Sequence, residues 1–216
     1  MKKVLLIASM LCVAVASTAC INNLAVQDLN NKAQSYMEQG DYTQAIERLK
    51  SSLDLDSSIF ETHYNLAVAY TKAEDYVNAV DEYKKALKIK STVPDLYFSL
   101  ATAENNLAVD LEQGRVRMND DGSLYTPKAD DIDFSQDYKL SDNAKQFVNE
   151  LFDSAIQNYQ KYLELSNKDF FTLVKEQGVK YCYSHLKRIE EKDSTLDKLP
   201  RFKKIDDIAA IYKILV

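Results

Sequence analysis

The sequence predicts an all-α fold: a helix-turn-helix solenoid of about three repeats, with C-terminal capping helices and one inserted loop or hairpin. Three observations lead to this prediction. Residues 26–59 and 60–93 repeat the same residue types at a period of 34, which is typical of two-helix repeats. Each copy has apolar residues at i, i+3, i+4 and i+7, the spacing of an amphipathic helix. Only four Gly and three Pro occur in 216 residues, too few for an all-β fold.

The two copies agree at the positions that a helical hairpin needs most. Small residues recur where helices would cross closely: Ala33 and Ala67 on the first helix, Ala45 and Ala79 on the second. Between the helices of the first copy, Gly40 is suited to the left-handed conformation that ends a helix. Asp41 is suited to capping the next helix. Each copy is therefore expected to form two antiparallel helices.

A third copy begins at Pro94, a residue that is favoured at the first position of a helix. No turn signal follows, so this helix is predicted to continue through residues 94–113. The repeat pattern resumes in residues 141–167, 42 residues later than an unbroken copy would place it. We therefore expect a third repeat split by an insertion at residues 114–140, with Ser141 capping the returning helix.

The insertion carries two signals. Asp121-Gly122, between segments that contain apolar residues, predicts a short β-hairpin. Asp130, Asp131, Asp133 and Asp137 form an acidic run, which we interpret as a solvated loop. A metal site is the alternative, but the spacing does not fit the EF-hand pattern.

After the repeats, residues 169–192 are predicted to form a capping helix that covers the end of the solenoid. Residues 193–216 are predicted to be a linker and a short apolar-striped helix. This last helix would cap the solenoid, fill its groove or be offered to a partner. Cys182, within the capping helix, is interpreted as a small core residue.

The first residues predict export. Residues 1–19 combine a basic start, a short apolar run and small residues, which together indicate a signal peptide. Cys20 follows directly, and the arrangement resembles a bacterial lipoprotein leader, which implies that Cys20 is lipidated and that residues 20–25 form a tether. Ser17 stands where such leaders usually have Leu. The alternative is ordinary cleavage that yields a soluble periplasmic or secreted protein.

The repeats resemble the tetratricopeptide repeat, because the small residues at the helix crossings and the residues of the turn match that family's motif. Leu29 and His63 stand where that family often has Trp, and Ser57 and Ser91 where it often has Pro. The resemblance implies a concave groove, lined by the first helix of each repeat, that binds polypeptides. On this basis the groove residues are Asn30, Gln34, Met37, Tyr64, Val68, Thr71, Lys72, Phe98, Thr102 and Asn105.

Tyr64 and Phe98 are the large aromatic residues of that set, and they would either anchor a partner or cover neighbouring helices. The Lys, Arg and Asn residues with which some members of the family hold a peptide carboxylate are largely absent, and Asn65 alone fits that pattern. A receptor for chaperone tails is therefore not expected.

Two classes of function remain open. The first is a non-enzymatic scaffold, anchored in the bacterial cell envelope, that binds envelope proteins or peptides. The second is a solute-transport accessory lipoprotein that binds a small ligand or a transporter component. A net charge of −6 argues against nucleic-acid binding. No catalytic grouping, cofactor or metal is expected, because neither a phosphate-binding loop nor a Ser/His/Asp grouping occurs.

Overall fold

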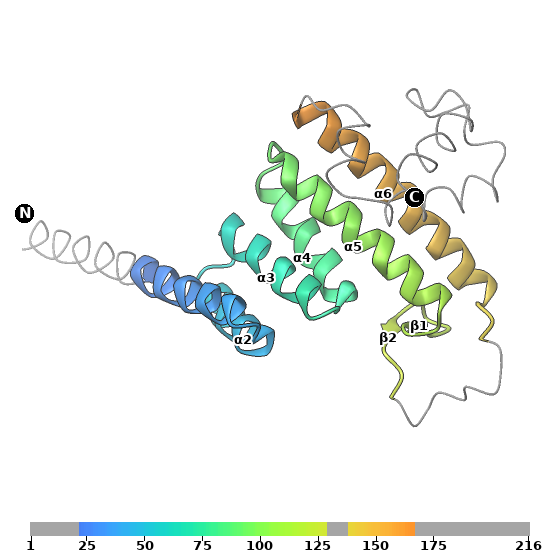
Figure 1. Ribbon diagram of the computed structural model, residues 1–216, viewed down its shortest axis with the longest axis horizontal. Helices are drawn as coiled ribbons and strands as arrows, with labels where there is room; N and C mark the ends of the chain where they lie inside the picture. The colour runs from blue at the N-terminus through green and yellow to red at the C-terminus, as the bar shows by residue number, and fades with distance from the viewer. Residues whose placement is uncertain (1–21, 129–137, 167–216) are drawn as a thin grey trace, which may run out of the picture. The chain divides into compact units, whose positions relative to one another are not determined.

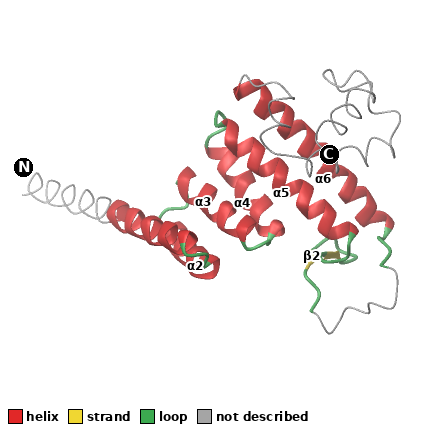
Figure 2. Ribbon diagram, in the orientation of Figure 1, coloured by secondary structure: helices red, strands yellow, loops and turns green. Residues whose placement is uncertain are grey.

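The computed structural model describes residues 22–128 and 138–166, which are mostly helical (Figures 1 and 2). The chain divides into two compact units, residues 1–158 and 159–216, and in the second only residues 159–166 are described. In chain order the elements are a helix over residues 22–38, α2 (Tyr42–Leu55), α3 (Phe60–Lys72), α4 (Tyr76–Ile89), α5 (Pro94–Glu112), β1 (Arg117–Met118), β2 (Leu124–Tyr125) and α6 (Asp142–Ser166).

The first two repeats form helical hairpins with the same turn. In each, a residue in the left-handed region follows the first helix: Gly40 with φ 77° and Glu74 with φ 61°. The side chain of the next residue, Asp41 or Asp75, accepts a hydrogen bond from the backbone N–H three residues on, at 3.1 or 3.2 Å. This bond satisfies one of the free donors at the start of a helix. The predicted turn and cap are confirmed.

The small residues lie where the helices pack. Ala33, Ala45, Ala67 and Ala79 are all 0% exposed. An alanine presents only a methyl group, so neighbouring helices can approach closely at these points. Around them lies a continuous apolar core, whose largest fully buried apolar side chains are Leu49, Leu66, Tyr83, Leu96, Leu100, Leu107 and Leu111.

The helix α5 continues without a turn, as the sequence predicted, and has 19 residues against 13 in α3. It ends at Glu112, and Gly114, two residues further on, has φ 71°. The N–H of Arg115 bonds back to the Asp110 carbonyl at 2.9 Å, which completes a left-handed helix ending. A Cβ on Gly114 would lie 2.8 Å from the ring of Tyr138. The start of the insertion is therefore packed against its end.

The predicted hairpin is present within the insertion. Arg117 pairs with Tyr125 and Met118 with Leu124 in an antiparallel ladder. The N–H of Gly122, which has φ 84°, donates to the Asn119 carbonyl at 2.9 Å. A turn followed by a left-handed glycine is a common way to connect hairpin strands.

The helix α6 completes the third repeat. Ser141 Oγ accepts a hydrogen bond from the Ala144 N–H at 3.2 Å, so the predicted cap is confirmed. Val148, Leu151 and Phe152 belong to the same core as the buried residues of α3, α4 and α5. Residues 142–158 thus form the second helix of the third repeat, whose first helix is α5. The insertion separates these two helices in sequence (Figure 1).

One boundary differs from the sequence prediction. Residues 22–25, expected to belong to a tether, are already helical. The segment contains neither Pro nor Gly, and Val26 directly after it is only 4% exposed. A helix anchored at Val26 can therefore extend by a turn at little cost. Cys20, the acidic run and the predicted elements after residue 166 lie outside the described residues.

Candidate functional site

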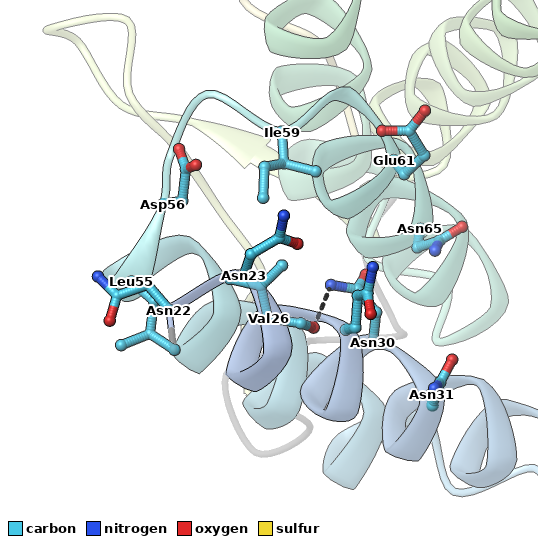
Figure 3. A pocket seen from close by; sticks show the side chains of 11 residues that line it. Asn22, Asn23, Val26, Asn30, Asn31, Leu55, Asp56, Ile59, Glu61 and Asn65 are labelled. Carbon is cyan, nitrogen blue, oxygen red and sulfur yellow. Dashed lines mark hydrogen bonds between the residues drawn. The ribbon is translucent and has the colours of Figure 1, made fainter. Parts of the chain in front are cut away.

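A pocket of about 730 Å³ lies between the helix of residues 22–38 and α3, next to the loop that joins α2 to α3 (Figure 3). Its walls are the first helices of two consecutive repeats. The lining residues come from three parts of the chain: Asn22, Asn23, Val26, Gln27, Asn30 and Asn31 from the first helix, Leu55, Asp56 and Ile59 from the end of α2 and the loop, and Glu61 and Asn65 from α3.

The lining has an unusual composition. Six of its residues carry side-chain amides, two carry carboxylates and three are apolar, and none of the lining residues is a lysine or arginine. A side-chain amide offers both donors and an acceptor. This set therefore matches the polar groups of a peptide main chain, with apolar side chains beside them.

Both carboxylates at the pocket have a defined environment. Asp56 Oδ1 accepts hydrogen bonds from the Ser58 N–H at 2.8 Å and from the Ser58 hydroxyl at 2.6 Å. The hydroxyl and the amide of Ser58 hold the pKa of Asp56 below its usual value. Glu61 lies in the first turn of α3, where its charge is favoured by the helix dipole. Ile59, the residue before α3, offers no side-chain cap.

Asn30, a predicted groove residue, also fastens three helices together. Its Nδ2 lies 3.0 Å from the Val26 carbonyl, 2.9 Å from Ser52 Oγ and 3.0 Å from Thr62 Oγ1. Ser52 and Thr62 are fully buried. Asn30 therefore holds the wall of the pocket in place, and its buried Oδ1 has no hydrogen-bond partner among the residues that the structure describes.

Tyr64 packs between its neighbours. Its ring stacks on Phe60 at 6.0 Å between centroids and meets Tyr83 edge-on at 5.9 Å. Burial raises the pKa of Tyr83 to about 12, with smaller effects from neighbouring groups, among them Thr71. The hydroxyl of Thr71 donates to the Ala67 carbonyl at 2.8 Å and lies 3.3 Å from the Tyr83 hydroxyl. These contacts favour a packing role for Tyr64, one of the two roles the sequence left open.

The other predicted groove residues do not line the pocket. Met37 and Val68 are half-buried against the core, and Gln34 is exposed and donates to Glu38 at 3.1 Å. Thr102 donates to the Phe98 carbonyl at 2.9 Å. Lys72 is exposed, while Phe98 and Asn105 are half-buried. A binding role for these residues stays a prediction.

The sequence prediction missed most of the pocket. Asn22 and Asn23 were assigned to a tether, and Asp56 and Ile59, at the end of the first repeat, were not among the predicted groove residues. One signal was available, because Asn23, Gln27 and Asn30 follow the i, i+4, i+7 spacing of one helical face. An uninterrupted stripe of amides on a helix that begins a repeat indicates a polar wall.

A second polar group lies at His63, on a smaller pocket of about 550 Å³. His63 is 7% exposed. Its Nδ1 lies 2.6 Å from Glu82 Oε2 and its Nε2 lies 3.0 Å from the Ser57 carbonyl. Lys85 Nζ is 2.8 Å from the other oxygen of Glu82. His63 thus fills the position of an aromatic packing residue while linking the α2–α3 loop to α4.

No group of three or more His, Cys, Asp or Glu residues in the described chain is arranged to hold a metal ion. Among the helices that the structure describes, none combines the length and apolar character needed to span a membrane.

Repeated helical hairpins with a 34-residue period define the tetratricopeptide class of solenoid. The family model described as tetratricopeptide repeat matches residues 30–94, the region of the first two repeats and of most of the pocket. No curated protein matches the chain.

Several solved structures are similar. One is the first tetratricopeptide-repeat domain of Spaghetti (RPAP3) bound to the HSP90 peptide SRMEEVD, with 17% identity and a TM-score of 0.45, covering 68% of this chain and 83% of that one. Two are crystal structures of MamA, each with 20% identity and a TM-score of 0.38; they cover 66% and 69% of this chain and 78% and 76% of theirs.

Proposed function

We propose that this protein is a non-enzymatic scaffold of the bacterial cell envelope that binds partner polypeptides in the groove formed by the first helices of its repeats. The observation that carries the proposal is the pocket between the first helices of the first two repeats. Its side-chain amides suit the hydrogen-bonding groups of a peptide backbone, and its apolar residues suit the side chains beside them.

The same lining argues against the alternative, a solute-transport accessory protein. An apolar cavity enclosed between repeats would favour a small ligand. This pocket has eight amide or carboxylate residues among its eleven, and six of the eleven belong to the helix of residues 22–38. A polypeptide partner is therefore the better match.

Affinity capture from cross-linked envelopes tests the binding part of the proposal. Gln27→Trp places a large side chain at the pocket without removing a packing contact, because Gln27 is exposed. We expect this variant to lose the captured partner. Glu47→Trp, at an exposed position of α2 that does not line the pocket, is the matched control and should capture the partner as the unaltered chain does. Equal capture by both variants would contradict a role for the groove.

The envelope part of the proposal is supported by the residue pattern of the first twenty residues. A lipid-modified Cys20 would need at least two acyl chains for stable anchoring, because one chain binds membranes only marginally. Replacing Cys20 with Ala should move the protein from the membrane fraction to the soluble fraction. A Cys20→Ala variant that still sediments with membranes after a high-salt wash would show that Cys20 is not the anchor.

A further inference from the structure

We infer that the pocket between residues 22–38 and α3 selects peptides with a lysine or arginine side chain. This inference rests on the proposed function, since it concerns the peptide that would lie in the same groove. The occupant is a basic segment of a partner polypeptide. The aliphatic stem of its lysine or arginine side chain would lie on the apolar residues of the pocket, and the cationic head would lie at the carboxylates.

The charges of the pocket lining favour a cation. Asp56 and Glu61 both line the pocket, and no lining residue is cationic. The two hydrogen bonds from Ser58 favour the ionised form of Asp56, because both donors stabilise its negative charge. A cation that enters the pocket therefore meets two negative charges, and an anion would be repelled by both.

The N-terminus of α3 carries a partial positive charge, which would disfavour a cation. The magnitude of that charge must be compared with the charge of the two carboxylates. An uncapped helix N-terminus is equivalent to roughly half a positive charge, and Ile59 leaves this one without a side-chain cap. The two carboxylates together carry about four times that charge, and Glu61 lies within the same first turn. The sum at the pocket is negative, so a peptide carboxylate is disfavoured there.

The apolar surface of the pocket suits the stem of a basic side chain. Val26, Leu55 and Ile59 supply apolar surface within the same pocket as the carboxylates (Figure 3). Leu55 is 41% exposed and has apolar surface still to be covered. Lysine and arginine side chains bury their methylene stems on apolar surface while keeping the charged head near water or a counter-ion. Neutral polar or acidic side chains would use only part of this lining.

A library of short random peptides, selected on the immobilised full chain, tests the inference. We expect the enriched peptides to share a lysine or arginine, and their affinity to fall as sodium chloride rises from about 0.05 M to about 0.5 M. Glu61→Gln should weaken a selected peptide about fivefold, the effect of losing one partly exposed ion pair. The exposed residue Glu47 does not line the pocket, so Glu47→Gln should leave the affinity unchanged.

The outcomes separate the inference from the proposed function. Enriched peptides that are neutral or acidic, compete for the groove and bind Glu61→Gln unchanged would overturn the inference and leave peptide binding intact. Enrichment of peptides held by a terminal carboxylate would do the same. If selection yields no peptide whose binding is lost in Gln27→Trp, both the inference and peptide binding in this groove are wrong.

Discussion

The carboxylate of Glu104 accepts a hydrogen bond from Asn158 Nδ2 at 2.8 Å, although 54 residues separate them in the chain. Glu104 is fully buried, and its second oxygen accepts from the Ser154 hydroxyl at 2.8 Å. Both partners lie on α6, beyond the insertion. Glu104 therefore joins the two halves of the split repeat.

The repeat period relates Glu104 to a residue of the preceding repeat. Glu104 stands 34 residues after Tyr70. Lys50 lies over the ring of Tyr70, 5.6 Å from its centroid, and Lys84, 34 residues after Lys50, lies 3.3 Å from the carboxylate of Glu104. In both cases a lysine of one repeat contacts the residue at this position of the next repeat. The contact is a cation–π contact at Tyr70 and an ion pair at Glu104.

Replacing Glu104 should therefore loosen the third repeat. Glu104→Ala leaves the side chains of Ser154 and Asn158 without their acceptor and opens a cavity, so we expect the free energy of unfolding to fall by about 3 kcal/mol. Glu150→Ala, at an exposed position of the same α6, should change it by less than about 0.5 kcal/mol. Urea denaturation of both variants measures the difference, and equal effects would mean that Glu104 does not join the repeat.

The turn between α3 and α4 contains a residue whose replacement by glycine should stabilise the fold. Glu74 has φ 61°, and its counterpart in the first repeat is Gly40. A non-glycine residue in the left-handed region costs about 1–2 kcal/mol, and a glycine at position 74 would remove this cost. The larger conformational entropy of glycine in the unfolded chain offsets part of the gain in stability. Glu74→Gly should raise the free energy of unfolding by about 0.5–1 kcal/mol.

Gly40→Ala is the reciprocal variant. Apart from Gly40 and its two neighbours in the chain, no described atom lies within 4 Å of a Cβ built on Gly40, so the change tests backbone conformation without a steric clash. We expect it to lower the free energy of unfolding by about 1 kcal/mol. Thermal or urea denaturation of the pair should give effects of opposite sign, and the same sign for both would contradict the explanation.

The alanines at the close helix crossings should not tolerate larger side chains. Ala67 and Ala79 are 0% exposed, so Ala67→Leu or Ala79→Leu must displace packed neighbours and should cost about 1–3 kcal/mol. Ala73 is exposed at the end of α3, and Ala73→Leu is the control. Unaltered melting temperatures for both core variants would show that the helices are not closely packed at these crossings.

Tyr83 predicts how stability changes at high pH. Its pKa is raised from 10.0 to about 12 in the folded chain, chiefly by burial, because ionisation would place a charge among apolar groups. The folded state therefore holds this proton more tightly than the unfolded state does. The corresponding stability is present below pH ~10 and is lost as the pH rises from about 10 to about 12.

At pH ~11 the loss attributable to Tyr83 is about 1 kcal/mol. The Tyr83→Phe variant lacks the ionisable hydroxyl, so its free energy of unfolding should fall less between pH ~9 and pH ~11. Urea denaturation of both proteins at the two pH values isolates the contribution of this residue from that of the other tyrosines. Parallel losses in the two proteins would contradict a raised pKa at Tyr83.

Much of the fold could be predicted because the information is local and periodic. The left-handed Gly40, the capping Asp41 and the buried alanines each follow from residue type at a fixed place in the repeat. The split of the third repeat was also predictable, because no turn signal follows Asn105 and the pattern returns after Ser141. The pairing of Glu104 with Asn158 was not, since it depends on two helices that only the folded chain brings together.

The candidate site was less predictable. Positions carried over from the resemblance included Asn30 but missed Asn22 and Asn23, which a helix longer than expected adds to the pocket. Asp56 belongs to a connecting loop, and its place depends on how that loop turns back towards the first helix. Tyr64 was identified as an aromatic groove residue, yet its contacts with Phe60 and Tyr83 depend on the packing of neighbouring helices.

Site-specific photo-crosslinking tests most directly whether a polypeptide binds between the first helices of the first two repeats. A photoreactive amino acid would be placed at Gln27 or Asn31, which line the pocket, and at Glu47, which does not. We predict that both pocket positions form an adduct with the same polypeptide and that Glu47 forms none. Adducts of equal yield from Glu47, or from Glu47 alone, would contradict it.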